Sequence, residues 1–186
     1  MRWIALALAL AAACRPDPAS PAAQTPAPGR VVARANGLPV SYADLVDGIR
    51  SGHLGGAPVL VLDELESFAL VNRECEVMLG QAACAGFGGT RERAERFLAL
   101  QFPPARLCGT VTADDYDAMY GRVARRIPPG TDRRAPEARL AVEGAICQAR
   151  ARQVQRAYIQ ALRKDARVEV DQDAVKEAVA EAEAGK

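Results

Sequence analysis

The sequence predicts a mainly α fold with a small β element (α+β). We expect a bundle of about five helices with a small N-terminal hairpin, one strand of which can pair with a strand near the C-terminus. Apolar residues recur at steps of three and four through most of the chain, which is typical of amphipathic helices. Capping patterns and Pro or Gly pairs separate these helices, and short alternating segments on either side of them predict the strands.

Length and composition fit one domain and exclude some classes of function. The 186 residues are 49% hydrophobic and 25% charged, which is enough for one hydrophobic core. The 24 basic and 23 acidic side chains nearly cancel, whereas nucleic-acid-binding proteins normally carry a basic excess. Aromatic residues make up only 5%, which argues against a surface that stacks bases or sugars.

The N-terminus is typical of an export signal. Met1 and Arg2 precede an apolar run that ends at Ala13, and this run is too short for a bilayer span of about 20 residues. Its end, Leu10-Ala11-Ala12-Ala13-Cys14, resembles a bacterial lipobox, which implies that residues 1–13 are a lipoprotein signal peptide and that Cys14 is lipidated. The alternative is an ordinary signal peptide cleaved after Ala13, which would leave Cys14 as an incidental thiol.

A tether is expected after the lipidation site. Residues 14–30 contain five prolines among small and polar residues, a composition that favours extended conformers over a packed core. The lipobox resemblance implies a protein anchored to a membrane on the periplasmic side of the cell envelope. Because an Asp directly after the lipidated Cys retains many lipoproteins in the inner membrane, Arg15 suggests the outer membrane.

The folded domain is expected over residues 31–170 and begins with a hairpin. Residues 31–35 and 38–40 are typical of short extended segments and lie on either side of Asn36-Gly37, the strongest two-residue hairpin signal. Ser41 and Asp44 then form a capping-box pattern, which predicts a short helix to about Arg50. Gly52, Gly55, Gly56 and Pro58 end this helix.

The central helices follow from periodicity. Residues 59–79 carry one helical stripe. It consists of Val61, Leu62, Leu65, Phe68, Ala69, Asn72, Cys75 and Leu79. Thr90 is expected to cap a helix that reaches Gln101, and Thr112 with Asp115 forms a second capping box before a helix that Pro128-Pro129-Gly130 ends.

The last long helix is expected from about Pro136 to Asp165, with flanking arginines on a solvated face. Its apolar stripe is Leu140, Cys147, Ala151, Val154, Tyr158, Ala161 and Leu162. Residues 167–170 alternate like a strand that can pair with residues 31–35. Residues 171–186 form an Ala/Glu-rich tail with weak period, and we expect it to fray.

Four cysteines follow Cys14, and an even number in an exported chain favours two disulfides with three possible connectivities. They are Cys75, Cys84, Cys108 and Cys147. If the two helices on either side of Pro128-Pro129-Gly130 are antiparallel, Cys108 returns near Cys147, which favours the pairs Cys108–Cys147 and Cys75–Cys84. Neither a Cys-x-x-Cys pair nor a Cys/His cluster occurs, so we expect no metal site and no cofactor.

No catalytic residue can be assigned from a motif. His53, the only histidine, lies between glycines without a Ser, Cys or acid at motif spacing, which favours an exposed loop residue over a base or ligand. Asp114, Asp115 and Asp117 lack the Gly and distal Glu of a Ca²⁺ loop and are better explained as helix capping. Residues 86–89 lack the Lys-Ser/Thr of a phosphate-binding loop.

Four segments, in order, resemble the chaperone module of the SurA and parvulin-type peptidyl-prolyl isomerase family. Residues 31–41 resemble its opening segment, with aliphatics, Asn-Gly and a Ser cap. Residues 62–74 are similar to its first long helix. Residues 111–120 resemble the helix before its isomerase domain, and residues 158–170 resemble the helix and strand that return after it.

The resemblance implies binding without catalysis. In the family, a parvulin domain of about 90 to 100 residues usually stands between the helix that contains residues 111–120 and the long returning helix. Here only residues 121–136 separate these two helices, which is too short for a core. The implied function is a lipid-anchored, periplasmic, chaperone-like protein that binds unfolded or exported polypeptides. The alternative is an adaptor lipoprotein that binds one specific partner in an envelope complex.

Overall fold

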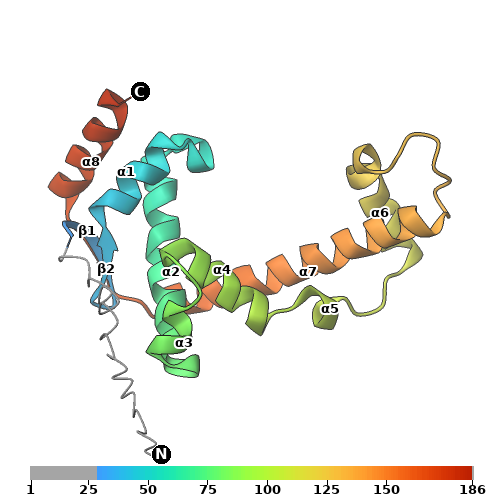
Figure 1. Cartoon of the computed structure of the whole chain (residues 1–186), viewed down its shortest axis with the longest axis horizontal. Helices are drawn as coiled ribbons and strands as arrows, with labels where there is room; N and C mark the ends of the chain where they lie inside the picture. The colour runs from blue at the N-terminus through green and yellow to red at the C-terminus, as the bar shows by residue number, and fades with distance from the viewer. Residues whose placement is uncertain (1–28, 186) are drawn as a thin grey trace, which may run out of the picture.

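The computed structural model describes residues 29–185, so the expected signal peptide, Cys14 and most of the tether lie outside the described residues. The mainly helical class with a small sheet is confirmed (Figure 1). The strands are β1 (Val31–Ala35), β2 (Leu38–Ser41) and β3 (Val168–Val170). The α-helices are α1 (Tyr42–Arg50), α2 (Pro58–Leu79), α3 (Gln81–Ala85), α4 (Thr90–Gln101), α5 (Pro104–Leu107), α6 (Ala113–Val123), α7 (Pro136–Lys164) and α8 (Gln172–Ala184). Two 3-10 turns are η1 (His53–Gly56) and η2 (Ala124–Arg126).

The sheet joins the two ends of the described chain. Its order is β2-β1-β3, and β1 pairs antiparallel with both neighbours. Asn36 and Gly37 both have positive φ, 51° and 79°, as the hairpin signal predicts. The Asn36 side chain also accepts a hydrogen bond from the Arg167 amide at 2.8 Å. One turn residue therefore closes the hairpin and fixes the start of β3.

The expectation that residues 171–186 fray is wrong, because most of them form α8. The Asp171 carboxylate accepts hydrogen bonds from the Asp173 and Ala174 amides and caps this helix. One stripe of α8 is buried in the core formed with α1 and β1. It consists of Ala174, Ala178 and Ala182. Because alanine is small, this stripe allows close approach of the helix but gives only a weak hydrophobic period in the sequence.

The body, which we define as residues 29–103 and 158–185, packs around α2. Gly48 lets α1 lie close to α2, since a Cβ at this position would stand 2.5 Å from Val61 Cγ1. The predicted Cys75–Cys84 disulfide is confirmed, with 5.9 Å between the Cα atoms. The predicted stripe of α2 is buried in its middle, but Leu79 is exposed at the helix end.

Two predicted helix caps differ from the observed ones. Ser41 Oγ accepts from the Asp44 amide at 3.4 Å, but the Asp44 side chain does not return a hydrogen bond to Ser41, so only half of that capping box forms. In α4 the capping position is Gly89, and Thr90 is the first helical residue. Thr112 and Asp115, in contrast, form the complete box.

Helix α2 is tied to α7 by Arg163, whose guanidinium pairs with Asp63 and with Glu66 at 3.6 Å. Glu66 is buried, and this burial raises its pKa, an effect that Arg163 partly opposes. Arg163 therefore compensates the negative charge of the Glu66 carboxylate, which the α2–α7 contact removes from water.

Helix α7 contributes to two separate cores. Its C-terminal half packs against the body through Tyr158, Ile159 and Leu162. Its N-terminal half packs against α6 and η2 through Ala138, Val142 and Ile146. We call this second unit, residues 113–147, the distal lobe, and Figure 1 shows it held away from the body by α7.

The predicted stripe of α7 is therefore wrong at positions in both halves of the helix. Leu140 is 72% exposed and Val154 is also exposed. The buried stripe of the distal lobe ends at Ile146, and the next buried residue is Ala151, two turns before Tyr158 on the helix face that packs on the body. Five residues turn a helix by about 140°, so the two cores use different faces of α7. A single periodic stripe cannot describe such a helix.

The first prediction concerns α8. Replacing Ala178 with Glu places an unpaired carboxylate in a fully buried position, so we expect a loss of about 3 kcal/mol or more in the free energy of unfolding. Ala180→Glu, on the exposed face of the same helix, should change it by less than about 0.5 kcal/mol. Urea titration followed by circular dichroism measures both. Equal effects would show that α8 is not docked.

Candidate functional site

The joint between the body and the distal lobe is cross-linked. The predicted Cys108–Cys147 disulfide is confirmed, with Cα atoms 4.2 Å apart. Arg150, one turn along α7, donates to the Cys108 carbonyl, to the Thr110 carbonyl at 3.1 Å and to Asp115 Oδ2 at 2.9 Å. The connection from α5 to α6 is thus fastened to α7 by a covalent bond and a guanidinium.

Asp115 joins this contact to the start of α6. Its carboxylate accepts hydrogen bonds from the Thr112 amide at 3.0 Å and the Thr112 hydroxyl at 2.8 Å. Hydrogen bonds from the Thr112 backbone and side chain, with the nearby Arg150 charge, lower the pKa of Asp115. Its stabilising contribution is therefore present above the unfolded carboxyl pKa and is lost as pH falls through the lowered pKa.

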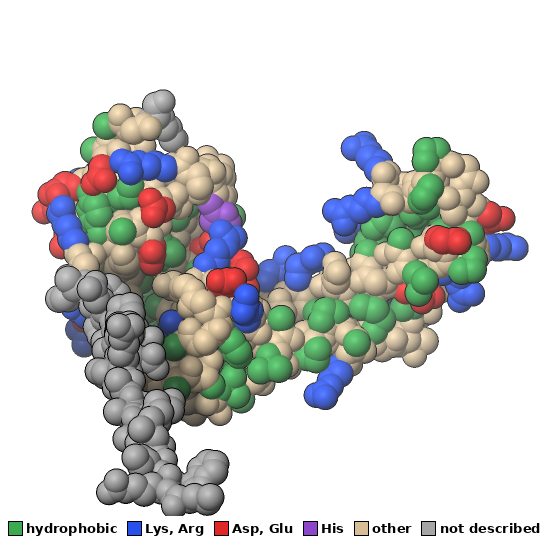
Figure 2. All heavy atoms as spheres, viewed as in Figure 1, with side chains coloured by type: hydrophobic (Ala, Val, Ile, Leu, Met, Phe, Trp, Pro, Cys, Tyr) green, Lys and Arg blue, Asp and Glu red, His purple; other side chains and the backbone are tan. Residues whose placement is uncertain are grey.

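A concavity separates the body from the distal lobe, and the middle of α7 forms its floor (Figure 2). Residues at steps of three and four beyond Val142 extend the α7 face that packs in the distal-lobe core toward the body. This continuation is Ala145, Ala149, Arg152 and Arg156. Arg152 and Arg156 are exposed, so the floor beyond the distal lobe is cationic.

An apolar group lies on the body beside the concavity. Val59 and Leu60 in the first turn of α2 are 78% and 52% exposed, and Leu54 in η1 is also exposed. We call these three residues the apolar knob. The segment that contains them projects from the body toward the distal lobe (Figure 1). A second exposed apolar group, Val77 with Met78, lies at the opposite end of α2.

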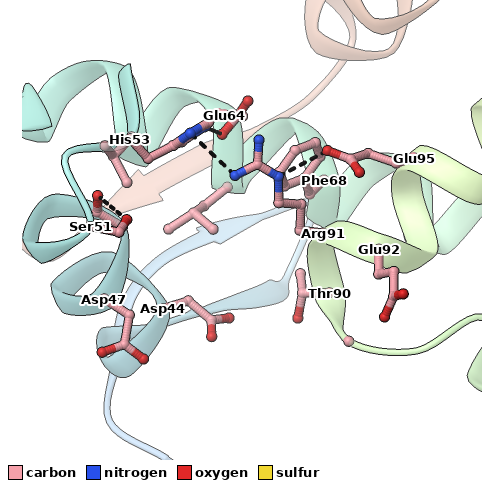
Figure 3. Close-up of a pocket in the computed structure, with 14 residues that line it drawn as sticks. Asp44, Asp47, Ser51, His53, Glu64, Phe68, Thr90, Arg91, Glu92 and Glu95 are labelled. Carbon is pink, nitrogen blue, oxygen red and sulfur yellow. Dashed lines mark hydrogen bonds and ion pairs between the residues drawn. The ribbon is translucent and has the colours of Figure 1, made fainter. Parts of the chain in front are cut away.

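A pocket with a volume of about 510 Å³ adjoins the apolar knob, between α1, η1, α2 and the start of α4 (Figure 3). Apolar side chains, Val61, Leu65 and Phe68, line one part of it. The polar part of the lining includes one cation, Arg91, and the side chains of Ser51, His53 and Thr90. Carboxylates outnumber them, and they are Asp44, Asp47, Glu64, Glu92 and Glu95. Such a lining suits a group with an apolar stem and a cationic end.

The expectation that His53 is an exposed loop residue is wrong, because its ring is partly buried in this pocket between two charged partners. Its Nε2 lies 2.5 Å from Glu64 Oε2, and its Nδ1 lies 3.2 Å from Arg91 Nη1. A guanidinium can only donate, so Nδ1 must accept. The neutral tautomer with the proton on Nε2 fits both contacts, and it donates to Glu64 (Figure 3).

This geometry holds His53 as a structural link. Both ring nitrogens are engaged, and the nearby Ser51 hydroxyl donates to the Gly48 carbonyl at 3.0 Å instead of to the imidazole. The hydrogen-bonded nucleophile and base that acyl transfer needs are therefore not assembled by these residues. Arg91 also forms an ion pair with Glu95, with 2.9 Å between Nε and Oε1. This series of side-chain contacts connects η1, α2 and α4.

The opposite wall of the pocket holds Asp44, which points toward Thr90 (Figure 3). Burial and the neighbouring Asp47 raise the pKa of Asp44, while a hydrogen bond from the Thr90 side chain lowers it in part. The carboxylate is thus held where its charge is less favourable than in water. A cationic group that enters the pocket would relieve this cost.

The other candidate residues have structural partners. Asp115 caps α6, and Asp117 forms an ion pair with Arg133. In the part of the chain that the structure describes, no three His, Cys, Asp or Glu side chains are grouped so that they could hold a metal ion. Over the same residues, no helix is long and apolar enough to cross a membrane.

Comparisons with protein-family models, with curated proteins and with solved structures found no match to this chain. The assignment of function therefore depends on the residues and geometry described above.

Sequence reasoning missed the partners of His53. Glu64 is 11 residues from His53 and Arg91 is 38 residues away, on two different helices. Neither spacing is a motif, so only the fold brings these groups together. A usable signal was the set of glycines around His53, Gly52 before it and Gly55-Gly56 after Leu54, whose positive φ angles permit the turn η1 that returns its ring to α2.

The second prediction tests the joint. Arg150→Met keeps the aliphatic stem but removes the contacts to Cys108, Thr110 and Asp115, so hydrogen exchange of the α6 amides should speed up at least about tenfold. Amides of α1 and α8 should not change. Arg152→Met, two residues along the same helix, is the control and should leave α6 unaffected. Unchanged exchange in both variants would show that Arg150 does not fasten the lobe.

Proposed function

We propose that this protein is a chaperone-like protein that holds unfolded or exported polypeptides in the concavity between its body and distal lobe. The observation that carries the proposal is the division of α7 between two cores. A chain of this length can bury more apolar surface in one core than in two small ones. The open arrangement gives up that burial and provides a long accessible face instead.

The chemistry of this face suits a polypeptide without fixed structure. The apolar knob supplies exposed Leu and Val side chains, and the α7 floor supplies long, flexible arginines. Such a surface can contact many sequences weakly, whereas a shaped site for one small molecule is normally enclosed. Holding a client needs only exposed apolar area that competes with aggregation.

The resemblance to the SurA and parvulin-type family supports the same proposal. The segments that resemble its chaperone module form β1, β2, α2, α6 and the end of α7 with β3. The residues between α6 and α7, where that family carries its isomerase domain, form η2 and a short connection. We propose binding without prolyl isomerisation, since this connection has no core of its own.

We also propose that the protein acts at the outer membrane, on the periplasmic side, through a lipid on Cys14. Two disulfides fit a non-reducing compartment. The adaptor hypothesis remains the second candidate function. The partly buried pocket with its carboxylates favours it, because a defined pocket suits one particular partner group.

The third prediction tests client holding. The purified protein, in amounts comparable to the client, should slow aggregation of several unrelated denatured proteins, measured by light scattering. Val59→Ser with Leu60→Ser should weaken this effect several-fold, because the apolar knob loses its two most exposed side chains. Val77→Ser with Met78→Ser is the matched control at the other end of α2 and should retain it.

The purified protein should not accelerate X-Pro isomerisation in a short peptide at concentrations at which a parvulin is active. Absence of holding by the unmodified protein, with one stoichiometric partner recovered from cells, would instead establish the adaptor function. If both double variants lose the same amount of holding activity, the apolar knob is not a specific part of the binding face.

The fourth prediction concerns the anchor. Cys14→Ser removes the thiol that would carry the lipid, so the protein should move from the outer-membrane fraction to the soluble periplasmic fraction. Fractionation followed by immunoblotting measures this change. Ala13→Gly keeps a small residue before Cys14 and should leave the protein in the membrane. Sedimentation of the Cys14→Ser variant with membranes would contradict the proposed anchor.

A further inference from the structure

Charge is divided unequally between the two ends of the molecule. Residues 104–157, which include the distal lobe and the middle of α7, carry ten Arg and six Asp or Glu, a net charge of +4. The remaining described residues carry eleven Lys or Arg and sixteen Asp or Glu, a net charge of −5. The near-neutral total of the whole sequence conceals this separation. We call residues 104–157 the arm.

Several arginines of the arm have no intramolecular counter-charge. Arg133, Arg139 and Arg150 form ion pairs with Asp117, Glu143 and Asp115. A second set is exposed, and no carboxylate of residues 29–185 lies within ion-pair distance of it. This set is Arg106, Arg122, Arg125, Arg126, Arg134, Arg152 and Arg156.

Five of these arginines belong to two groups that border the concavity. Arg152 and Arg156 lie on the α7 face that continues the distal-lobe stripe. The other three lie at the end of α6 and in η2, where Val123 and Ile127 point into the core and the arginines point outward. Figure 2 shows Lys and Arg side chains above α7 and on the side of the distal lobe that faces the body.

Unpaired guanidiniums in this arrangement select an anionic partner. Guanidinium binds carboxylate through two parallel hydrogen bonds, and repulsion among neighbouring cations is relieved when carboxylates bind. The concavity favours a polypeptide segment over a membrane, because a planar bilayer cannot follow the surface down to a floor recessed between two lobes. The apolar knob on the facing body wall adds a requirement for apolar residues.

We propose that the arm binds acidic segments of polypeptides, so that the clients are chains in which carboxylates accompany apolar residues. This inference depends on the proposed holding function and names its substrate class. The acidic body cannot supply this selectivity, since its own net charge repels such segments. Selectivity therefore lies in the five unpaired arginines that border the concavity.

The test uses three fluorescent peptides of about 20 residues that share their apolar positions and differ elsewhere in charge. The intervening residues are Glu in the first peptide, Gln in the second and Lys in the third. Anisotropy titration of the full chain should give binding of the acidic peptide at least about tenfold tighter than binding of the basic one. The difference should shrink in about 1 M salt, where the screening length falls to about 3 Å.

Two variants locate the effect. Arg152→Glu with Arg156→Glu should reduce affinity for the acidic peptide about tenfold and leave the neutral peptide unaffected. The control is Arg73→Glu with Arg96→Glu, which makes the same charge change on exposed positions of the body and should alter neither. Far-ultraviolet circular dichroism confirms that each variant is folded.

Each other outcome overturns the inference. Equal affinity for the three peptides would leave the holding function intact but remove its selectivity for acidic clients. Failure to bind any peptide, together with failure to suppress aggregation, would remove both proposals. Binding to phosphatidylglycerol vesicles without binding to the acidic peptide would assign the arm to a lipid surface. If the control variant loses as much affinity for the acidic peptide, the net charge of the protein, and not the arm, determines binding.

Discussion

The arrangement of this molecule depends on one helix being shared between two hydrophobic cores. The N-terminal half of α7 buries Ala138, Val142 and Ile146 against α6 and η2, while its C-terminal half packs on the body. A helix that is continuous through both cores keeps them at a fixed separation and a fixed rotation. The concavity is a consequence of that sharing, and the Cys108–Cys147 disulfide with Arg150 stops the intervening connection from detaching.

The body is closed by contacts between the two ends of the described chain. Strand β1 is central, so both β2 and β3 depend on it, and Asn36 links the hairpin turn to Arg167. Helix α8 then covers α1 with its alanine stripe. This closure fixes α1 and α2, which carry the apolar knob and the pocket. The surfaces that we assign to binding are therefore held by elements from opposite ends of the sequence.

Local signals predicted much of this fold. Asn36-Gly37 predicted the hairpin turn, and Thr112 with Asp115 predicted the capping box. The expected antiparallel arrangement about Pro128-Pro129-Gly130 predicted the Cys108–Cys147 disulfide. Features that depend on tertiary context were not predicted. The stripe of α7 changes face between Ile146 and Ala151, which a single period cannot show, and the buried alanines of α8 have too little hydrophobicity to reveal burial.

The candidate site was less accessible to sequence reasoning than the fold. The chain's one histidine has partners on two helices, and the charge separation between arm and body disappears in the total of 24 basic and 23 acidic residues. The histidine's contacts exist only after folding brings distant residues together, and the charge difference becomes meaningful only when the fold defines residues 104–157 as a separate arm. Sequence patterns of short range cannot contain them.

Photo-crosslinking from α7 to an unfolded client tests the central claim that polypeptides are held in the concavity. A photoreactive residue at Gln153 lies on the face of α7 that forms the floor, and one at Leu140 is also exposed but lies about 140° around the helix. The account predicts crosslinks to the client from position 153 and few from position 140, although Leu140 is the more hydrophobic side chain. Equal crosslinking from both positions, or crosslinking from position 140 alone, would contradict it.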